Sequence, residues 1–504
     1  MYGNIHRQLA ILSAAVVLSG VSAIAPGQEI WDPYAPPLDP AYAARSSSGN
    51  NMAETDAYLI SNNRQRSKLA DEVAALKEEL QKIKDKQAAD EKKAAGRPSV
   101  TAGGRFYADW TAYDQNAASI TQIGDQQNGF EFRRARIFLQ GEAFNVIDYK
   151  VQYDFADNES ALSSVSSTTS DLGGFLPSPV VTSVSSSSSI LGVPGFRDVY
   201  LTIKELPVLG HVRVGHYKEP FGLEQLTSSK YITLIERGLL TAFTPERNVG
   251  VMAFDYSENE RMTWAIGAFI SENDDDPPIF RDDDGGTALT MRYTCLPWYD
   301  EATEGRGLLH LGLAYSYRDM ADDTVSFRER PEAHLGSRVV DTGTITGVPN
   351  YQQLGLEAAF VYGPWSVQSE YMAAFVDRTA ATDVDFNGFY VYTSYFLTGE
   401  NRNYKRTAGT FDRIKPYENF FRVRTEDGSV RTGWGAWEIG YRFSTLDLND
   451  TGVAGGNVSD HTIGLNWYLN PYTRLMFNYV NSDLRSGGTT GNMNIFETRA
   501  QIDF

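Results

Sequence analysis

Apolar and polar residues alternate along most of this chain, from residue 97 to its end. In FRDVYLTIKEL, residues 196–206, one face carries Val199, Leu201 and Ile203, and the other carries Asp198, Tyr200, Thr202 and Lys204. The final ten residues, IFETRAQIDF, keep the same alternation up to Phe504. A period of two is that of a β-strand with one apolar and one polar face. The region therefore predicts an all-β fold, and the question is which solvent the apolar face meets.

The alternating segments divide into about 16 strands of about ten residues, as in outer-membrane barrels. The predicted strands are 101–113, 129–144, 147–156, 196–204, 210–218, 247–257, 260–271, 287–295, 308–320, 350–362, 364–376, 386–398, 433–445, 460–469, 472–481 and 493–504. An even number of strands with lipid-facing apolar sides predicts a transmembrane antiparallel β-barrel over residues 97–504. Hydrocarbon tolerates no unpaired strand edge, so the last strand is expected to pair with the first.

The connections between these strands fall into two alternating classes. One class is mostly short, as in Asn145-Val146, YGPW and NP. The other is long and polar, as in the serine-rich stretch after residue 158, SENDDDPPIFRDDDGG and residues 321–348. Short turns and long loops are typical of the periplasmic and extracellular ends of a barrel. One long segment, 399–432, falls on the short-turn side, and the sequence offers no physical account of it.

The N-terminal region predicts export. LAILSAAVVLSGVSAIA is a short apolar run, and Val21-Ser22-Ala23 offers small residues for cleavage, so residues 1–23 read as a signal peptide. An uncleaved N-terminal membrane anchor is the alternative. Residues 24–60 are rich in Pro, Ser and Asn and predict an extended linker.

Residues 61–96 carry a helical pattern instead. Leu69, Val73, Leu76, Leu80 and Ile83 alternate spacings of four and three, which is the seam of a coiled coil. About two heptads are marginal for a lone helix, so association with other copies in the periplasm is expected. A single amphipathic helix packed on its own protein remains the other reading.

Composition excludes several function classes. The 504 residues carry 45 Lys and Arg against 64 Asp and Glu, a net charge of −19, which disfavours a nucleic-acid partner. The single cysteine, Cys295, allows neither an intrachain disulfide nor a thiolate metal cluster. The chain has no G-x-S-x-G or H-E-x-x-H motif, and its histidines are scattered singly. No catalytic residue, metal or cofactor is therefore predicted.

The connection 219–246 differs from the other long ones because it is neither acidic nor low in complexity. It is too apolar for a freely solvated loop, so one reading folds it into the barrel, with its polar side narrowing the pore. The other reading packs it over the barrel mouth. Hydroxyl and cationic groups in and beside it are suited to an anion. These candidate residues are Lys218, Ser228, Ser229, Lys230, Arg237 and Arg247.

Several strands add basic residues to the polar face. The alternation points Arg134, Arg136 and Arg213 into the lumen, and places Arg133 outward or near a strand end. An arginine on the lipid face at the bilayer centre costs about 2–4 kcal/mol, which favours this register. Other inward residues have mixed charge: Lys204, Arg292, Asp198, Glu370 and Asp503.

Long stretches of the chain resemble the phosphate-selective porin O and P family. They are VRVGHYKEPFGLEQLTSSKYIT, ERNVGV, LHLGLAYSYR, GFYVYTSYFLTGE, GLNWYLNPYTRLMFNYV and the final QIDF. The resemblance runs from about residue 100 to the end. It implies a trimer of outer-membrane barrels, each with a pore for phosphate or polyphosphate that the loop after KEPFG constricts. It also implies anion-binding positions at Ser228, Ser229 and Arg237, and a basic wall at Arg133 and Arg134.

The sequence departs from this family at one position. Phosphate-specific members carry a lysine shortly before the Ser-Ser pair, where this chain has Gln225 in EQLTSS. Lys218 and Lys230 are the candidates to replace it. The sequence thus predicts an outer-membrane channel for anions. A general porin without phosphate selectivity and an envelope tether acting through residues 61–96 are the alternatives.

Overall fold

The computed structural model describes residues 98–156, 195–271, 286–424, 428–486 and 488–504, together with Lys82 and Lys84, which are both helical. The predicted signal peptide 1–23 and linker 24–60 lie outside the described residues. So does the predicted coiled coil 61–96, apart from those two lysines. Residues Lys92–Phe504 form one compact unit, separate from Met1–Glu91.

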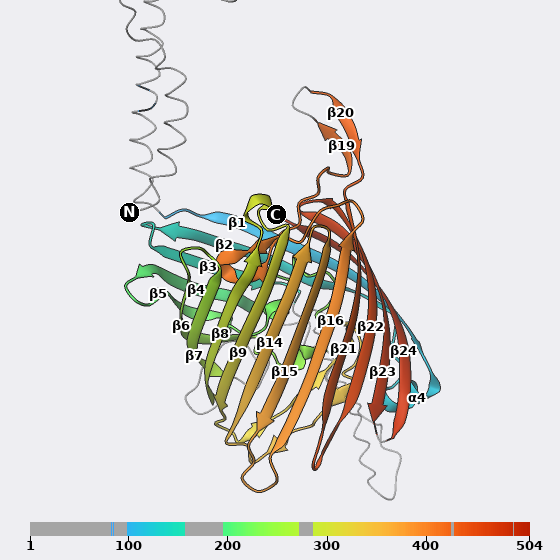
Figure 1. Ribbon diagram of the computed structural model, residues 1–504. Coiled ribbons are helices and arrows are strands. Elements are labelled where there is room, and N and C mark those ends of the chain that lie inside the picture. Colours follow the sequence, from blue (N-terminus) through green and yellow to red (C-terminus); the bar gives the residue numbers. More distant parts are fainter. Residues whose placement is uncertain are drawn as a thin grey trace, which may run out of the picture. The chain divides into compact units, whose positions relative to one another are not determined.

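Sixteen antiparallel strands pair in sequence order and close into a barrel (Figure 1). They are β1 (Thr101–Gln115), β2 (Gly129–Ala143), β3 (Ile147–Asp154), β4 (Gly195–Leu206), β5 (Gly210–Lys218), β6 (Arg247–Tyr256), β7 (Met262–Ser271), β8 (Gly286–Tyr299), β9 (Gly307–Asp319), β14 (Asn350–Tyr362), β15 (Trp365–Val376), β16 (Val384–Phe396), β21 (Ala436–Asp450), β22 (Val453–Asn470), β23 (Thr473–Ser486) and β24 (Thr489–Asp503). The predicted strand number and fold class are confirmed.

The last strand closes the barrel against the first, as the alternation predicts. Arg105 of β1 pairs with Asp503 of β24, and Phe106 with Ile502. Ile502 is 46% exposed, whereas the side chain of Arg499 on the same strand is almost fully buried. The apolar face of the final strand therefore points outward and its charged face inward.

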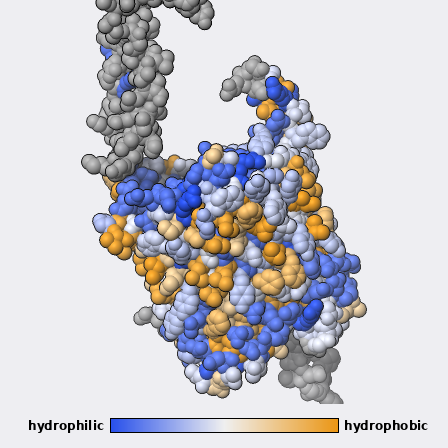
Figure 2. All heavy atoms as spheres, in the orientation of Figure 1, coloured by the Kyte–Doolittle hydropathy of each residue, from blue (hydrophilic) through white to orange (hydrophobic). Residues whose placement is uncertain are grey.

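The whole barrel follows this inside-out arrangement. Apolar residues such as Leu139, Val214 and Leu313 are exposed on the outer wall, and Figure 2 shows hydrophobic side chains spread over it. Arg442 and Arg474, by contrast, are among the largest fully buried side chains. A wall that is apolar outside and charged inside is the pattern of a barrel whose outer face meets lipid.

The connections keep the predicted alternation between the two ends of the barrel. At one end β2 joins β3, β14 joins β15 and β22 joins β23 through two or three residues. At the other end lie α4 (Ala117–Ile123), the loop with α5 (Leu223–Leu226) and η1 (Leu239–Phe243), and residues 320–349. The last segment forms two small pairs, β10 (Thr324–Val325) with β13 (Ile345–Thr346) and β11 (Arg328–Glu329) with β12 (Val340–Asp341).

A large apolar cluster fills part of the barrel interior. It brings Leu239 and Phe243 of η1 against Phe327 from residues 320–349, and against Phe386 and Leu446 of the wall strands β16 and β21. Each such fully buried side chain contributes about 1.5–3 kcal/mol relative to exposure. The cluster holds these two connections inside the barrel.

One strand register corrects the sequence-based orientation of Arg133. Between the pairs Tyr107–Arg134 and Asp109–Glu131, β1 supplies one residue and β2 supplies two, which is a β-bulge. The extra residue breaks the strict alternation. Arg133 and Arg134 therefore both reach the interior, and the prediction that Arg133 faces outward or sits near a strand end is wrong.

Candidate functional site

The connection from β5 to β6, residues 219–246, crosses the barrel interior and is called the inward loop below. Its apolar side chains are buried to within a few per cent, including Leu223, Leu234 and Ile235. Leu234 lies against β22 at Gly464, and Leu223 packs with Leu308 and Val361 of the wall. Of the two sequence-based readings, the one that folds this loop into the barrel is confirmed.

Charged wall residues tie the inward loop to β15, β21 and β23. The carboxylate of Glu370 accepts hydrogen bonds from the backbone N–H groups of Leu223 and Glu224, both at 2.8 Å. Arg442 donates to the carboxylate of Glu224 at 3.0 Å, and Arg474 donates to the carbonyl of Ile232 at 2.8 Å. Charge-assisted bonds such as these are stronger than neutral ones, so the loop is held in a defined position.

Glu236 forms a further tie at the other side of the loop. Its carboxylate accepts from Arg133 at 3.0 Å and from Arg499 at 2.6 Å. Burial opposes its ionisation, but these two guanidinium groups hold the pKa of Glu236 well below its usual range. The ion pairs therefore stabilise the loop at neutral pH, and weaken only as the pH falls below the ordinary glutamate pKa of about 4.3.

A cavity of about 590 Å³ lies between the inward loop and the wall from β1 to β8. Thirteen cationic side chains line it, against four carboxylates, Asp148, Asp198, Glu246 and Asp255. The cations are Arg105, Arg133, Arg134, Arg136, Lys150, Arg197, Lys204, Arg213, Lys218, Arg237, Arg247, Arg292 and Lys405. A protein of net charge −19 thus concentrates positive charge around its internal cavity.

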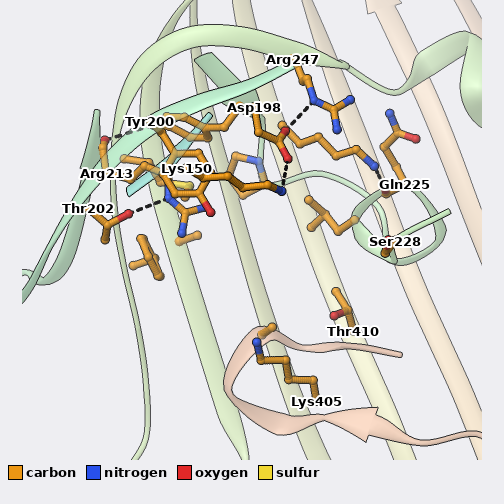
Figure 3. Close-up of a pocket in the computed structure, with 18 of the residues that line it drawn as sticks. Lys150, Asp198, Tyr200, Thr202, Arg213, Gln225, Ser228, Arg247, Lys405 and Thr410 are labelled. Atoms are coloured by element: carbon orange, nitrogen blue, oxygen red, sulfur yellow. Dashed lines mark hydrogen bonds and ion pairs between the residues drawn. The ribbon is translucent and has the colours of Figure 1, made fainter. Parts of the chain in front are cut away.

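Some of these cations are neutralised in place. Asp198 accepts from Lys150 at 2.6 Å and from Arg247 at 2.7 Å, and Figure 3 shows it between them. Arg136 donates to Asp154 at 2.5 Å. These pairs fix the orientation of the wall cations.

Arg134 has no such partner among the described residues. Its guanidinium Nε and Nη1 atoms are buried and form no hydrogen bond, and its neighbours Arg133 and Arg136 carry like charge. Arg105 also has an unpaired nitrogen. Its Nη1 donates a hydrogen bond of 2.8 Å to the hydroxyl of Ser229, but its buried Nε has no hydrogen-bond partner. Buried donors without acceptors are costly, so this corner of the cavity is set up to receive an acceptor.

Two more cations are held by neutral groups at the turn of the inward loop. Arg237 donates to the carbonyls of Glu224 at 3.0 Å and Thr227 at 2.9 Å, and Lys218 donates to the carbonyl of Gln225. Carbonyl acceptors position a cation without cancelling its charge. Lys218 therefore lies against the backbone of Gln225, the position at which the sequence is expected to depart from the family pattern.

Nine of the ten residues predicted from the sequence line the cavity. Those nine are Arg133, Arg134, Arg136, Arg213, Lys218, Ser228, Ser229, Arg237 and Arg247. The tenth, Lys230, does not line it, and its ammonium group lies 3.5 Å from the Asp503 carboxylate near the barrel seam.

Sequence reasoning missed Arg105, Lys150, Arg197 and Lys405. Arg105 lies two residues before the buried Tyr107, and Lys150 two residues before the buried Gln152. Each therefore points to the same side of its strand as that buried residue, so alternation alone predicts both. Arg197 lies beside a register shift between β3 and β4, where alternation fails. Lys405 lies in the long exception at the short-turn end.

Part of that exception, in the connection between β16 and β21, folds back into the barrel. Its strands β17 (Tyr404–Lys405) and β18 (Thr410–Phe411) pair around η3 (Arg406–Ala408), and Figure 3 shows Lys405 and Thr410 across the cavity from Arg213. Gly409 has φ +62°, and a Cβ there would lie 2.9 Å from the Thr294 hydroxyl, so glycine suits this close approach to the wall. The hairpin narrows the lumen from the short-turn end.

Further contacts hold this hairpin in place. The hydroxyl of Tyr404 lies 2.6 Å from His310 Nδ1, and Arg292 donates to the Gly409 carbonyl at 2.9 Å. Beyond it, β19 (Phe421–Arg424) and β20 (Val430–Gly433) form a second hairpin that projects from the rim (Figure 1). The sequence offered no physical account of this insertion; its first hairpin is an internal element anchored to the wall.

No group of three or more His, Cys, Asp or Glu side chains in the part of the chain that the structure describes is arranged to hold a metal ion. No helix among the described residues is long and apolar enough to cross a membrane.

Comparison with known proteins agrees with this geometry. The profile of the family described as phosphate-selective porin O and P matches residues 100–504. The chain belongs to this family of channels. Porin O of Pseudomonas aeruginosa PAO1 is 29% identical over 414 residues, which cover 76% of this chain and 82% of that protein. The chain is thus an outer-membrane porin.

Solved porin structures resemble this one at low sequence identity. A loop L8 deletion mutant of OmpT, an outer membrane protein of Vibrio cholerae, is 11% identical with a TM-score of 0.46, covering 81% of this chain and 99% of that one. An anion-selective porin from Comamonas acidovorans is 11% identical with a TM-score of 0.45, covering 81% and 100%.

Proposed function

We propose that this porin passes anions across the outer membrane, with phosphate or polyphosphate as its preferred solute. The observation that carries the proposal is the cavity lining, where thirteen cations face four carboxylates although the whole chain is acidic. Charged rings and walls of this kind set the ion selectivity of channels. The excess of acidic residues in the chain must therefore lie outside the cavity lining, and it does not set the charge of the pore.

The corner at Arg134, Arg105 and Ser229 is the proposed binding point. Phosphate oxygens would accept from the unpaired guanidinium groups and from the serine hydroxyl, replacing water lost on entry. Lys218 and Arg237, which backbone carbonyls hold in place, would donate hydrogen bonds to the anion from the loop side. The remaining cations, from Arg133 to Lys405, would then offer a series of weaker sites. Such sites let the anion leave the binding point and pass through the pore.

Family membership supports a proposal about the assembly and its surroundings. We infer a homotrimer of barrels, each with its own pore and with lipid around its outer wall. Residues 61–96 would lie in the periplasm, where a coiled coil would assist trimer formation.

A general anion porin without phosphate selectivity is the second candidate, and Gln225 favours it. This side chain is 2% exposed and its Oε1 atom has no hydrogen-bond partner, so it offers an acceptor where the family carries a lysine. The two candidates differ in how the pore responds to phosphate.

Phosphate titration into a chloride current separates these candidates. In planar bilayers containing the purified protein, we expect phosphate to block single-channel chloride current at about micromolar concentration, a binding energy of about 8 kcal/mol. Block would reflect the binding point at Arg134 and Arg105. A chloride current that stays anion-selective and is indifferent to millimolar phosphate would leave the general anion porin instead.

A further inference from the structure

Aromatic rings line one side of the same basic cavity. Tyr200 on β4 and Phe254 and Tyr256 on β6 all contribute to its lining, and these three residues are called the aromatic shelf below. Tyr256 is 37% exposed, and Tyr200 and Phe254 are partly exposed. The shelf therefore meets the water of the cavity and is not part of the closed core.

The shelf has a rigid base. Tyr200 lies edge-on to Tyr217, with ring centres 6.0 Å apart, and Tyr217 lies edge-on to Phe269 at 5.7 Å. Tyr217 and Phe269 are buried, together with Met252 and Ala288 of the neighbouring wall. The exposed rings are therefore held in position before any ligand arrives.

Arg213 lies directly over the shelf. Its guanidinium carbon is 4.0 Å from the ring centre of Tyr200 and 5.0 Å from that of Phe254. Its Nε donates to the hydroxyl of Thr202 at 3.0 Å, a bond drawn in Figure 3, and no described carboxylate pairs with it. Stacking thus orients this cation and leaves its charge available to an anion.

Inorganic phosphate makes no use of an aromatic surface. Its oxygens need hydrogen-bond donors, whereas rings that face water carry an unfavourable apolar surface. An organic ligand whose own ring lies on the shelf would cover that surface and add stacking energy of about 0.5–1.5 kcal/mol. The cavity volume of about 590 Å³ is within the usual range for small-molecule sites.

We propose that the aromatic shelf with Arg213 is a binding site for organic phosphate monoesters that carry a planar ring. The phosphate group would bind Arg213 and the adjoining wall cations, and the ligand ring would lie beside Arg213, against the parts of Tyr200, Phe254 and Tyr256 that the guanidinium leaves uncovered. This inference rests on the proposed function, because recognition of the phosphate group requires the anion pore. It adds ring-bearing phosphate monoesters to the solutes of that pore.

Block of chloride current by esters of matched charge tests the site. The probes are phenyl phosphate and methyl phosphate, with inorganic phosphate alongside, applied to the full-length protein in planar bilayers. We expect phenyl phosphate to block at about tenfold lower concentration than methyl phosphate, as stacking and ring desolvation predict.

Two substitutions at one position distinguish ring stacking from other effects. Tyr200 has no described hydrogen bond through its hydroxyl, so Tyr200→Phe keeps the ring and should keep the preference for phenyl phosphate. Tyr200→Leu combined with Phe254→Leu should reduce that preference to about twofold or less, with block by inorganic phosphate unchanged. Both variants keep apolar side chains on the base of the shelf.

The outcomes separate the shelf from the pore function. Equal block by both esters in the wild type, with inorganic phosphate still blocking, would overturn the shelf and leave the proposed function standing. Preference for phenyl phosphate that survives the double leucine variant would also overturn the shelf. Absence of block by all three probes would overturn both proposals.

Discussion

Replacing Arg134 by glutamine is expected to weaken the block of chloride current by phosphate about 10- to 100-fold. The side chain of Arg134 is buried, its Nε and Nη1 atoms form no hydrogen bond, and no described carboxylate neutralises it. A hydrogen bond to a charged group contributes about 1.5–3 kcal/mol, and each 1.4 kcal/mol is tenfold in affinity. Phosphate titration of single channels measures the change.

A control for this variant is Arg485→Gln. Arg485 is exposed at the long-loop end of β23 and lies outside the cavity, so its loss should leave phosphate block within about twofold of wild type. Arg134→Gln should fold normally, because no described group loses a hydrogen bond to this guanidinium. Unchanged phosphate block in Arg134→Gln would show that the unpaired guanidinium is not part of the anion site.

Replacing Glu370 by alanine is expected to release the inward loop from the wall. The carboxyl group of Glu370 accepts from two backbone N–H groups of the loop, and leaving a buried donor unsatisfied costs about 1–3 kcal/mol. Loss of these two hydrogen bonds would let the turn that carries Arg237 and Ser229 move. Single-channel conductance should rise above that of wild type, and phosphate block should weaken about tenfold or more.

The matched control for the loop variant is Asp319→Ala. Asp319 is an exposed acid at the end of β9 that the loop does not contact, so conductance and block should stay at wild-type values. If Glu370→Ala keeps both wild-type conductance and wild-type block, the inward loop does not form the constriction.

The alternation of apolar and polar residues predicts most of the barrel because strand faces alternate with a period of two. Ile502 and Arg499 face opposite ways on the last strand, as the sequence predicts. The same reasoning could have placed Arg105, which shares the phase of Tyr107 and Asp109.

Other features depend on contacts with distant parts of the chain, so the pattern of a single strand does not predict them. Arg133 turns inward because β2 has one residue more than β1 between two paired positions, and only the partner strand reveals that bulge. The hairpin of Tyr404 and Lys405 enters the lumen because His310 and Arg292, roughly a hundred residues earlier, hold it. Local sequence carries no sign of such distant anchors.

The inward loop stands between these two cases. The apolar content of the loop predicts that the loop is buried, which is confirmed. It does not predict which partners the basic side chains of the loop contact. Lys218 and Arg237 donate to backbone carbonyls, while Lys230 lies beside Asp503. Those partners depend on how the loop crosses the barrel. The predicted coiled coil 61–96 stays a prediction.

The measurement that tests the central claim most directly is the reversal potential across a potassium chloride gradient. With the purified protein in a planar bilayer, the zero-current potential should lie close to the equilibrium potential of chloride, because thirteen cations face four carboxylates around the cavity. A zero-current potential close to the equilibrium potential of potassium would contradict the account. It would mean that the net charge of −19, and not the basic lining, sets the ion selectivity of the pore.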